Sequence, residues 1–300
     1  MQKIKIRLPA TITNFGPGIH SLGLAVSLYV TVEISKRDDT KLMIDFKGEG
    51  RDTFTTDLEN PVILGMSRLF QHLEKTMLGI NIRITNHIPL NSGLGTEMVF
   101  MVAGVLGAND LLGYPYNRDA ILELAARFTR NDYAVTTLRG GLTASFTDED
   151  HFYHRSLPVM PFEVIIAAPV QEGFHKATLP QNIPTQNALN NLIQIPLFLD
   201  ALRTGDFELL LAMMPDHVYA PQVRKNISGY GHVAEMAQRA GAVFVTPIGD
   251  GPALLALAQT GHQRIAEDMR LAFQSAGIEA KSWVLPVDTQ GVVISAVGSI

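Results

Sequence analysis

The residues whose types and spacing best suit a binding or catalytic site lie in one short segment, Pro89-Leu90-Asn91-Ser92-Gly93-Leu94-Gly95-Thr96-Glu97. Gly93 and Gly95 permit backbone angles and close approach that a Cβ would block. An apolar run follows, so the segment predicts a glycine loop that leads into a buried helix with Thr96 as its N-cap. Free N–H groups and the helix dipole make such a helix start an anion-binding site. Glu97 is unusual there, because it places an anion where an anion would bind.

The elements around this loop alternate between strands and helices. Residues 80–85 alternate apolar and polar side chains as a strand does, and the helix from Thr96 to about Leu112 is apolar on most faces, which predicts burial. Asn60 and Pro61 have the residue types of an N-cap and a first helical position. In the first half we expect strands at 4–8, 28–34, 42–46 and 140–146, and further helices at 61–77 and 119–128.

The second half continues the mixture after a polar, proline-punctuated stretch between Thr147 and Pro161. We place a domain boundary there, which gives domains of residues 1–155 and 156–300. Expected strands are 162–168, 242–245, 280–285 and 291–294, with an apolar stretch at 253–258, and expected helices are 187–203, 206–214, 232–239 and 265–276. The last strand is expected to close the sheet of this half. Together the two halves predict an α+β architecture.

Composition excludes several classes of function. The chain has 300 residues, 46% of them hydrophobic, which is enough for a large core. A net charge of −5 gives no electrostatic case for nucleic acid, and no apolar run is long enough for a membrane span. The alternating start at 3–7 is typical of a strand and not of a signal peptide. Zero cysteines exclude disulfides, thiolate catalysis and cysteine-ligated metal, and we expect a cytoplasmic location.

Four segments in chain order together resemble the homoserine kinases of the GHMP small-molecule kinase superfamily. They are the glycine-containing stretch 9–25, the loop 89–97, the segment 216–229 and the turn Ile248-Gly249-Asp250-Gly251-Pro252. The resemblance spans nearly the whole chain. It implies an N-terminal domain similar to ribosomal protein S5 domain 2, a ferredoxin-like C-terminal domain, and an acceptor site between them. It also implies Mg²⁺ and ATP as cofactors and a small-molecule substrate, and relatives are often homodimers.

The resemblance assigns roles to individual residues where they match. The nucleotide-binding positions are Asn60, Ser92, Gly93, Leu94, Gly95 and Thr96, with Asn60 near the adenine. The acceptor positions are Asn14, His20, Lys176 and Arg224. Arginine at position 224 suits an acceptor carboxylate, because its planar fork binds that group through two parallel hydrogen bonds.

Several positions depart from the pattern on the nucleotide side. The paired serines after Gly95 are Thr96 and Glu97, and the magnesium-ligating glutamate is Phe128. Thr96 still offers a hydroxyl, whereas Glu97 repels a triphosphate unless a cation lies between them. Glu97 therefore has two readings: a metal ligand beside Thr96, or a first-turn glutamate that stabilises the helix in place of the phosphate.

Other departures lie on the acceptor side. His20 replaces the aspartate that in relatives grips the homoserine ammonium, and the threonine and arginine of a later motif are Glu172 and Lys176. His20 suits acid–base work or an anionic group. Glu172 and Lys176 are either pocket residues or a surface pair at helical spacing. Asp132 is a base, a metal ligand or part of a solvated loop, and Asp250 in place of serine is read as a turn aspartate with a local backbone bond.

Two hypotheses follow. In the first, the chain transfers phosphate from Mg-ATP to the hydroxyl of an amino-acid-like or carboxylate-bearing acceptor, with homoserine disfavoured by His20. In the second, phosphotransfer is lost, and the chain is a small-molecule binder or an ATP-independent lyase, isomerase or cyclase that uses His20, Glu172, Lys176 and Asp132. The direction in which Glu97 points separates them.

Overall fold

The larger of two sheets contains the beginning and the last strand of the chain. The computed structural model describes residues 3–54, 58–77, 79–149, 151–170 and 174–297. The sheet order is β11-β1-β2-β4-β3, with β5 on β2 and β6 on β5, and only β3 and β4 pair in parallel. Its strands are β1 (Lys3–Thr13), β2 (Leu22–Lys36), β3 (Leu42–Gly48), β4 (Ile80–Asn86), β5 (Leu142–Asp148), β6 (His151–Leu157) and β11 (Val293–Val297).

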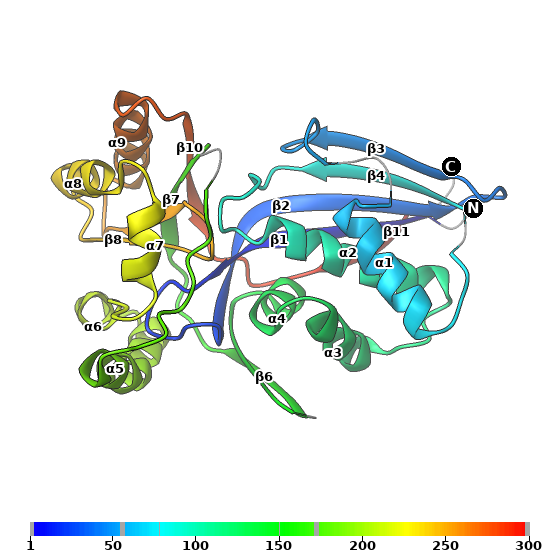
Figure 1. Ribbon diagram of the computed structural model, residues 1–300, viewed down its shortest axis with the longest axis horizontal. Coiled ribbons are helices and arrows are strands. Elements are labelled where there is room, and N and C mark those ends of the chain that lie inside the picture. Colours follow the sequence, from blue (N-terminus) through cyan, green and yellow to red (C-terminus); the bar gives the residue numbers. More distant parts are fainter. Residues whose placement is uncertain (1–2, 55–57, 78, 150, 171–173, 298–300) are drawn as a thin grey trace.

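Helices α1 to α4 pack against this sheet (Figure 1). They are α1 (Pro61–His72), α2 (Thr96–Leu111), α3 (Arg118–Phe128) and α4 (Asn131–Arg139). Helix α2 is buried almost all round, as its uniformly apolar sequence predicts. It lies against α1 at glycine positions, since a Cβ on Gly104 would collide with the Val62 carbonyl. This packing fixes the start of α2, and with it the glycine loop.

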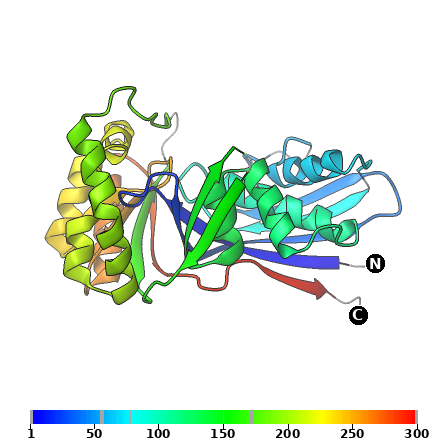
Figure 2. The ribbon, with the colours of Figure 1, turned by 90° about the horizontal axis from the view of Figure 1, so that it is seen from below.

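The smaller sheet lies beside the larger one and carries the remaining helices (Figures 1 and 2). Its antiparallel order is β10-β7-β9-β8. The strands are β7 (Glu163–Pro169), β8 (Phe244–Pro247), β9 (Leu254–Leu257) and β10 (Ala280–Pro286), and the helices are α5 (Thr185–Thr204), α6 (Phe207–Met213), α7 (Ala220–Asn226), α8 (Tyr230–Ala240) and α9 (His262–Ser275). The rings of Phe15 and Phe198, 5.8 Å apart, join the cores of the two halves.

The predicted α+β architecture is confirmed, and most elements lie within a few residues of the expected ranges. Two expectations are wrong. The last strand does not close the second sheet, because β11 pairs with β1 through partners such as Arg7 and Val293. Helix α1 ends at His72 and not at Met77. Helices α4 and α7 and strand β6 were not predicted. The boundary between residues 155 and 156 falls inside β6 and remains a prediction.

In the part of the chain that the structure describes, no helix is both long enough and apolar enough to cross a membrane.

Candidate functional site

The glycine loop is held by its own hydroxyl groups. Gly93 and Gly95 have φ angles of +94° and +76°, which only glycine adopts without strain. Gly95 is the N-cap of α2, so the assignment of Thr96 as the cap is wrong. The Thr96 and Ser92 hydroxyls both donate to the Pro89 carbonyl, over 2.8 and 2.9 Å. These two side chains therefore keep the loop in shape. The Ser92 oxygen also accepts the Leu94 N–H over 3.3 Å, whereas the lone pairs of the Thr96 oxygen stay available.

A second glycine turn, residues 248–252 between β8 and β9, packs backbone against backbone on this loop. The Ala253 N–H donates to the Ser92 carbonyl over 2.9 Å. A Cβ on Gly251 would lie far inside contact distance of the Gly93 nitrogen. The glycines are thus required by close approach, and the loop is located by the smaller sheet as well as by α2.

The loop opens on a cavity of about 320 Å³ between the two halves of the molecule. The first hydrogen bond inside α2 runs from the Val99 N–H to the Gly95 carbonyl, so the N–H groups of residues 96–98 have no acceptor within the helix. Lys176, which is exposed, lines the same cavity. Donors at a helix start and a nearby ammonium group are suited to a phosphate chain.

Glu97 also lines this cavity and is exposed. Neither a hydrogen bond nor an ion pair joins its carboxylate to any described residue. Glu97 therefore does not occupy the N–H donors of the loop, and its carboxylate is available to a cation. Its assignment as a metal ligand with Thr96 remains a prediction. Within the described residues no group of three histidine, aspartate or glutamate side chains is arranged to hold a metal.

Arg130, at the N-cap of α4, organises the acceptor side of the cavity. Its Nε and one terminal nitrogen bind both oxygens of Asp132, over 3.1 and 2.5 Å. Its other terminal nitrogen binds Asp250 over 2.5 Å, and the guanidinium lies 4.8 Å from the centre of the Tyr133 ring. Burial lowers the pKa of Arg130, but the bonds and charges of Asp132 and Asp250 outweigh it and raise the pKa overall. Arg130 is therefore a permanent cation between two carboxylates.

Two sequence expectations about these carboxylates are wrong. Asp132 lies on α4 with only 2% of its side chain exposed, and not in a solvated loop. Asp250 makes no local turn bond. Its carboxylate accepts from Asn14 and from the Tyr219 hydroxyl, each over 3.2 Å, as well as from Arg130. Both aspartates thus belong to one network at the junction of the two sheets.

His20 adjoins this network and is held in its neutral form. Its backbone N–H donates to Asn14 over 3.0 Å, and its Nδ1 lies 2.7 Å from Arg130. Arginine can only donate, so Nδ1 is the acceptor and the proton of the neutral ring is on Nε2. Burial and the Arg130 charge lower the pKa of His20, against smaller opposing effects of Asp132 and Asp250.

The lowered pKa of His20 predicts a specific loss of stability in acid. In the unfolded chain His20 takes up a proton near its ordinary value of 6.5, before the folded protein does. The stabilisation is therefore complete above pH 6.5 and is lost progressively as the pH falls from that value through the lower pKa of the folded protein. Urea unfolding at about pH 7.5 and about pH 5.5 should show a larger loss for the wild type than for His20→Gln. Equal losses would contradict this placement of His20.

The remaining predicted positions are placed as follows. Asn60 is buried and its side chain caps α1 by accepting from the Val62 N–H over 3.0 Å. Arg224, on α7, lies with its guanidinium 5.4 Å from the centre of the Tyr230 ring, and its Nε is buried without a hydrogen bond. Phe128 packs against the core at the end of α3. Glu172 lies outside the described residues.

The sequence analysis assigned no role to three residues of this site, Arg130, Tyr133 and Tyr219. The rings of His20 and Tyr219 are 5.8 Å apart, and burial together with Asp250 raises the pKa of the tyrosine. Burial first, then the Asp250 charge, also raises the pKa of Tyr133. Both tyrosines thus stay protonated: the Tyr219 hydroxyl donates to Asp250 over 3.2 Å, and the Tyr133 hydroxyl accepts from Thr13 over 3.1 Å. The position of Arg130 inside a family motif was the available signal.

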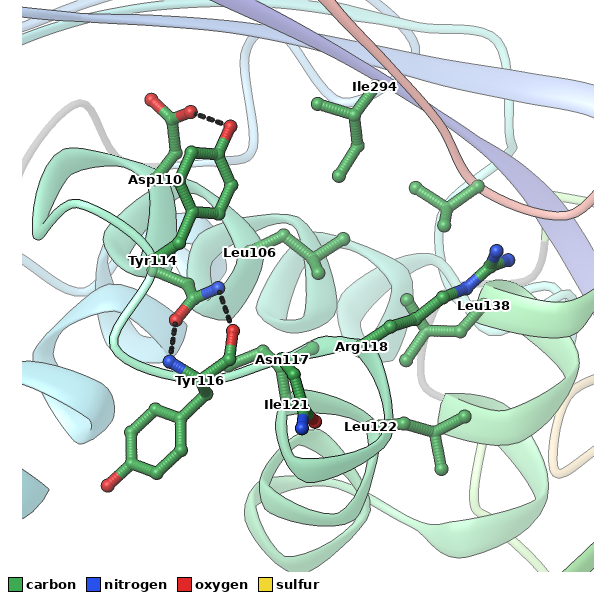
Figure 3. A pocket seen from close by; sticks show the side chains of 12 residues that line it. Leu106, Asp110, Tyr114, Tyr116, Asn117, Arg118, Ile121, Leu122, Leu138 and Ile294 are labelled. Atoms are coloured by element: carbon green, nitrogen blue, oxygen red, sulfur yellow. Dashed lines mark hydrogen bonds between the residues drawn. The ribbon is translucent and has the colours of Figure 1, made fainter.

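A larger cavity of about 570 Å³ lies elsewhere, between α2, α3, α4 and β11 (Figure 3). Its walls are mostly apolar, including Leu106, Ile121 and Ile294. Among the side chains in Figure 3, Tyr114 donates to Asp110, and the Asn109 amide binds the backbone of Tyr116. This cavity lacks the N–H donors and ion pairs of the loop cavity, so we place the reaction at the loop.

Comparison with known proteins agrees with this geometry. The model of the GHMP kinases N terminal domain matches residues 62–141, which contain the loop and α2. The homoserine kinase of Carboxydothermus hydrogenoformans is 31% identical over 280 residues, 92% of this chain and 91% of the relative. The chain belongs to the homoserine kinase family. The homoserine kinase of Microchaete diplosiphon is also 31% identical to this chain, over 97% of both chains.

A solved structure extends the agreement to the fold. The crystal structure of homoserine kinase from Cytophaga hutchinsonii matches 98% of this chain and 97% of its own, with a TM-score of 0.83 and 26% identity. The predicted family and its two-domain α+β fold are thereby confirmed. As a member of this family, the chain is a kinase, an enzyme that transfers a phosphoryl group to a hydroxyl.

Proposed function

We propose that the chain transfers the terminal phosphoryl group of Mg-ATP to the hydroxyl of an amino-acid-like acceptor, with homoserine as the first candidate. The observation that carries the proposal is the cavity in which the free N–H groups of α2 lie beside Lys176 and the Arg130 network. One end of this cavity suits a phosphate chain, and the other end has the paired charges that orient a zwitterion.

The residues present are compatible with the nucleotide. The loop from Ser92 to Thr96 would hold the phosphates through backbone N–H groups, because Gly93 and Gly95 leave room that side chains would fill. Thr96 keeps free lone pairs and Glu97 an unpaired carboxylate, so this pair would hold Mg²⁺. The bound metal and nucleotide supply the phosphoryl group and neutralise its developing charge.

The contribution of the protein to phosphoryl transfer is mainly position and charge. Lys176 would stabilise the charge on the transferred group from the cavity wall. Arg224 would bind an acceptor carboxylate, since its buried Nε has no hydrogen-bond partner in the structure. Asn14 and Tyr219 orient Asp250 and so shape the acceptor end of the cavity.

The test is transfer from radiolabelled Mg-ATP to L-homoserine and to a panel of other hydroxy acids. Lys176→Met should lower kcat/KM by about 10- to 100-fold, the usual worth of a hydrogen bond from a charged group. Lys225→Met is the matched control, because Lys225 is exposed and bonds only its neighbour Gln222. Absence of both transfer and Mg-ATP binding at millimolar nucleotide would overturn the proposal.

One observation favours the second hypothesis, in which phosphotransfer is lost. Phe128 stands where relatives have a magnesium-ligating glutamate, and it packs against the core. A binder or ATP-independent enzyme would then use His20 and Lys176, since Asp132 is buried with both its oxygens bound by Arg130. Calorimetry separates the two: binding of a small carboxylate without any binding of Mg-ATP would favour this second function.

A further inference from the structure

Two departures from the homoserine kinase pattern meet at Arg130. His20 stands in place of an aspartate, and Asp250 in place of a serine. They lie far apart in sequence, but Arg130 contacts both, Asp250 over 2.5 Å and His20 over 2.7 Å. A carboxylate has thus been lost at position 20 and one has been gained at position 250, at the two terminal nitrogens of the same guanidinium.

His20 cannot take over the role of the lost carboxylate. Its Nδ1 already accepts from Arg130, and its pKa is lowered, so the ring is neutral and its remaining nitrogen carries a proton. An ammonium group needs an acceptor, preferably an anionic one. The side chain at position 20 offers neither a negative charge nor a free acceptor, in agreement with its place beside a permanent cation.

Asp250 has what position 20 lacks. Its side chain is 22% exposed and lines the loop cavity. One carboxylate oxygen accepts from Asn14 and Tyr219, and the other accepts from Arg130. A carboxylate has about four acceptor positions, so one remains on the oxygen that faces Arg130. Three donors from three different elements fix the orientation of that position.

The other carboxylates near the cavity are less suited to this role. Asp132 is 2% exposed, and both its oxygens are bound by Arg130, with one also accepting the Tyr133 N–H. It neutralises the guanidinium and has no access to the cavity lining. Glu97 lies in the first turn of α2, at the phosphate end. A cation at the acceptor end therefore meets Asp250.

We infer that Asp250 is the residue that binds the acceptor's ammonium group and selects an amino acid over the corresponding hydroxy acid. The inference rests on the proposed function for its substrate class. It also changes the expectation drawn from His20: loss of the aspartate at position 20 does not remove homoserine as an acceptor, because a carboxylate is present at position 250 on the same guanidinium. Arg130 is then a positioning residue, which orients Asp250 and keeps His20 neutral.

The experiment compares two acceptors that differ only in the ammonium group, L-homoserine and 4-hydroxybutanoate. Binding of each is measured by calorimetry, and phosphoryl transfer from Mg-ATP is measured separately. The wild type should prefer homoserine. Asp250→Asn should reduce that preference by about 10- to 100-fold, the usual worth of a hydrogen bond to a charged group. A general structural loss would weaken both acceptors equally and leave the preference unchanged.

A charge-relocation variant gives the decisive second measurement. Asp250→Ser should lose the preference, and His20→Asp with Asp250→Ser should regain it, because the carboxylate returns to position 20, beside the other terminal nitrogen of Arg130. An undiminished preference in both Asp250→Asn and Asp250→Ser would overturn the inference. If the wild type binds homoserine in preference and the variants do not, the inference holds even where no phosphate is transferred, and only the proposed function fails.

Discussion

Replacement of Arg130 by methionine is expected to lower the free energy of unfolding by about 2 to 4 kcal/mol, since it leaves the buried carboxylate of Asp132 without its partner. Asp132 is 2% exposed, and Arg130 supplies two of its hydrogen bonds. The exposed third of the Arg130 side chain places the effect below the loss expected for a fully buried pair. Methionine preserves the unbranched aliphatic stem, so lost packing contributes little. Urea unfolding of the purified variant measures the effect.

Two companion variants identify the cause. Arg130→Met combined with Asp132→Asn should recover most of the lost stability, because no uncompensated charge then remains in the core. Arg130→Lys should lie between the wild type and Arg130→Met, because it keeps the charge but not the planar fork that binds both oxygens. If the double variant is as unstable as Arg130→Met, the loss comes from packing and the buried-charge explanation is wrong.

The features that sequence predicted well are those encoded over short distances. The glycine loop and helix α2 follow from neighbouring residues, since Gly93 and Gly95 set the turn and the apolar run after them sets the burial. The cap of α1 at Asn60 was equally local. Such signals require no knowledge of what packs on the segment from elsewhere.

The features that sequence missed depend on partners distant along the chain. The sequence of β11 is typical of an apolar strand, but its residues do not indicate that it pairs with β1 instead of β10. Asp250 reads as a turn residue because its partners, Asn14 and Arg130, are 236 and 120 residues away. Helix α4 was not predicted, because the polar residues at its start are typical of a loop when their buried partners are unknown.

The same separation explains why the family pattern was informative about the fold and misleading about the acceptor. Each glycine position can be compared with the family pattern by itself, because a match indicates the local backbone conformation without reference to other residues. The exchanges at His20 and Asp250 acquire meaning only together, because the guanidinium of Arg130 contacts both side chains. Taken singly, His20 indicates a lost ammonium site; taken with Asp250, it indicates a relocated one.

The contact between the two glycine turns leads us to expect a large loss of activity from the addition of a single methyl group. Gly251→Ala adds one methyl group where a Cβ would collide with the backbone of Ser92 and Gly93. Backbone atoms cannot move aside as a flexible side chain does, so the loop must shift away from the second sheet. We expect kcat/KM for phosphoryl transfer to fall by roughly 100-fold from misplacement of the phosphate site, and stability to fall by about 1 to 3 kcal/mol from overpacking.

Gly231→Ala is the matched control for this prediction, because the same methyl group at the start of α8 meets no atom within 4 Å. There the change should leave activity intact and should raise stability by up to about 1 kcal/mol, since alanine favours a helix over glycine. Gly251 does not have a positive φ angle, so alanine at that position is disfavoured by contact alone and not by backbone strain. A Gly251→Ala enzyme with the activity of the wild type would show that the two turns do not need to touch, and that the loop is located by α2 without help from the smaller sheet.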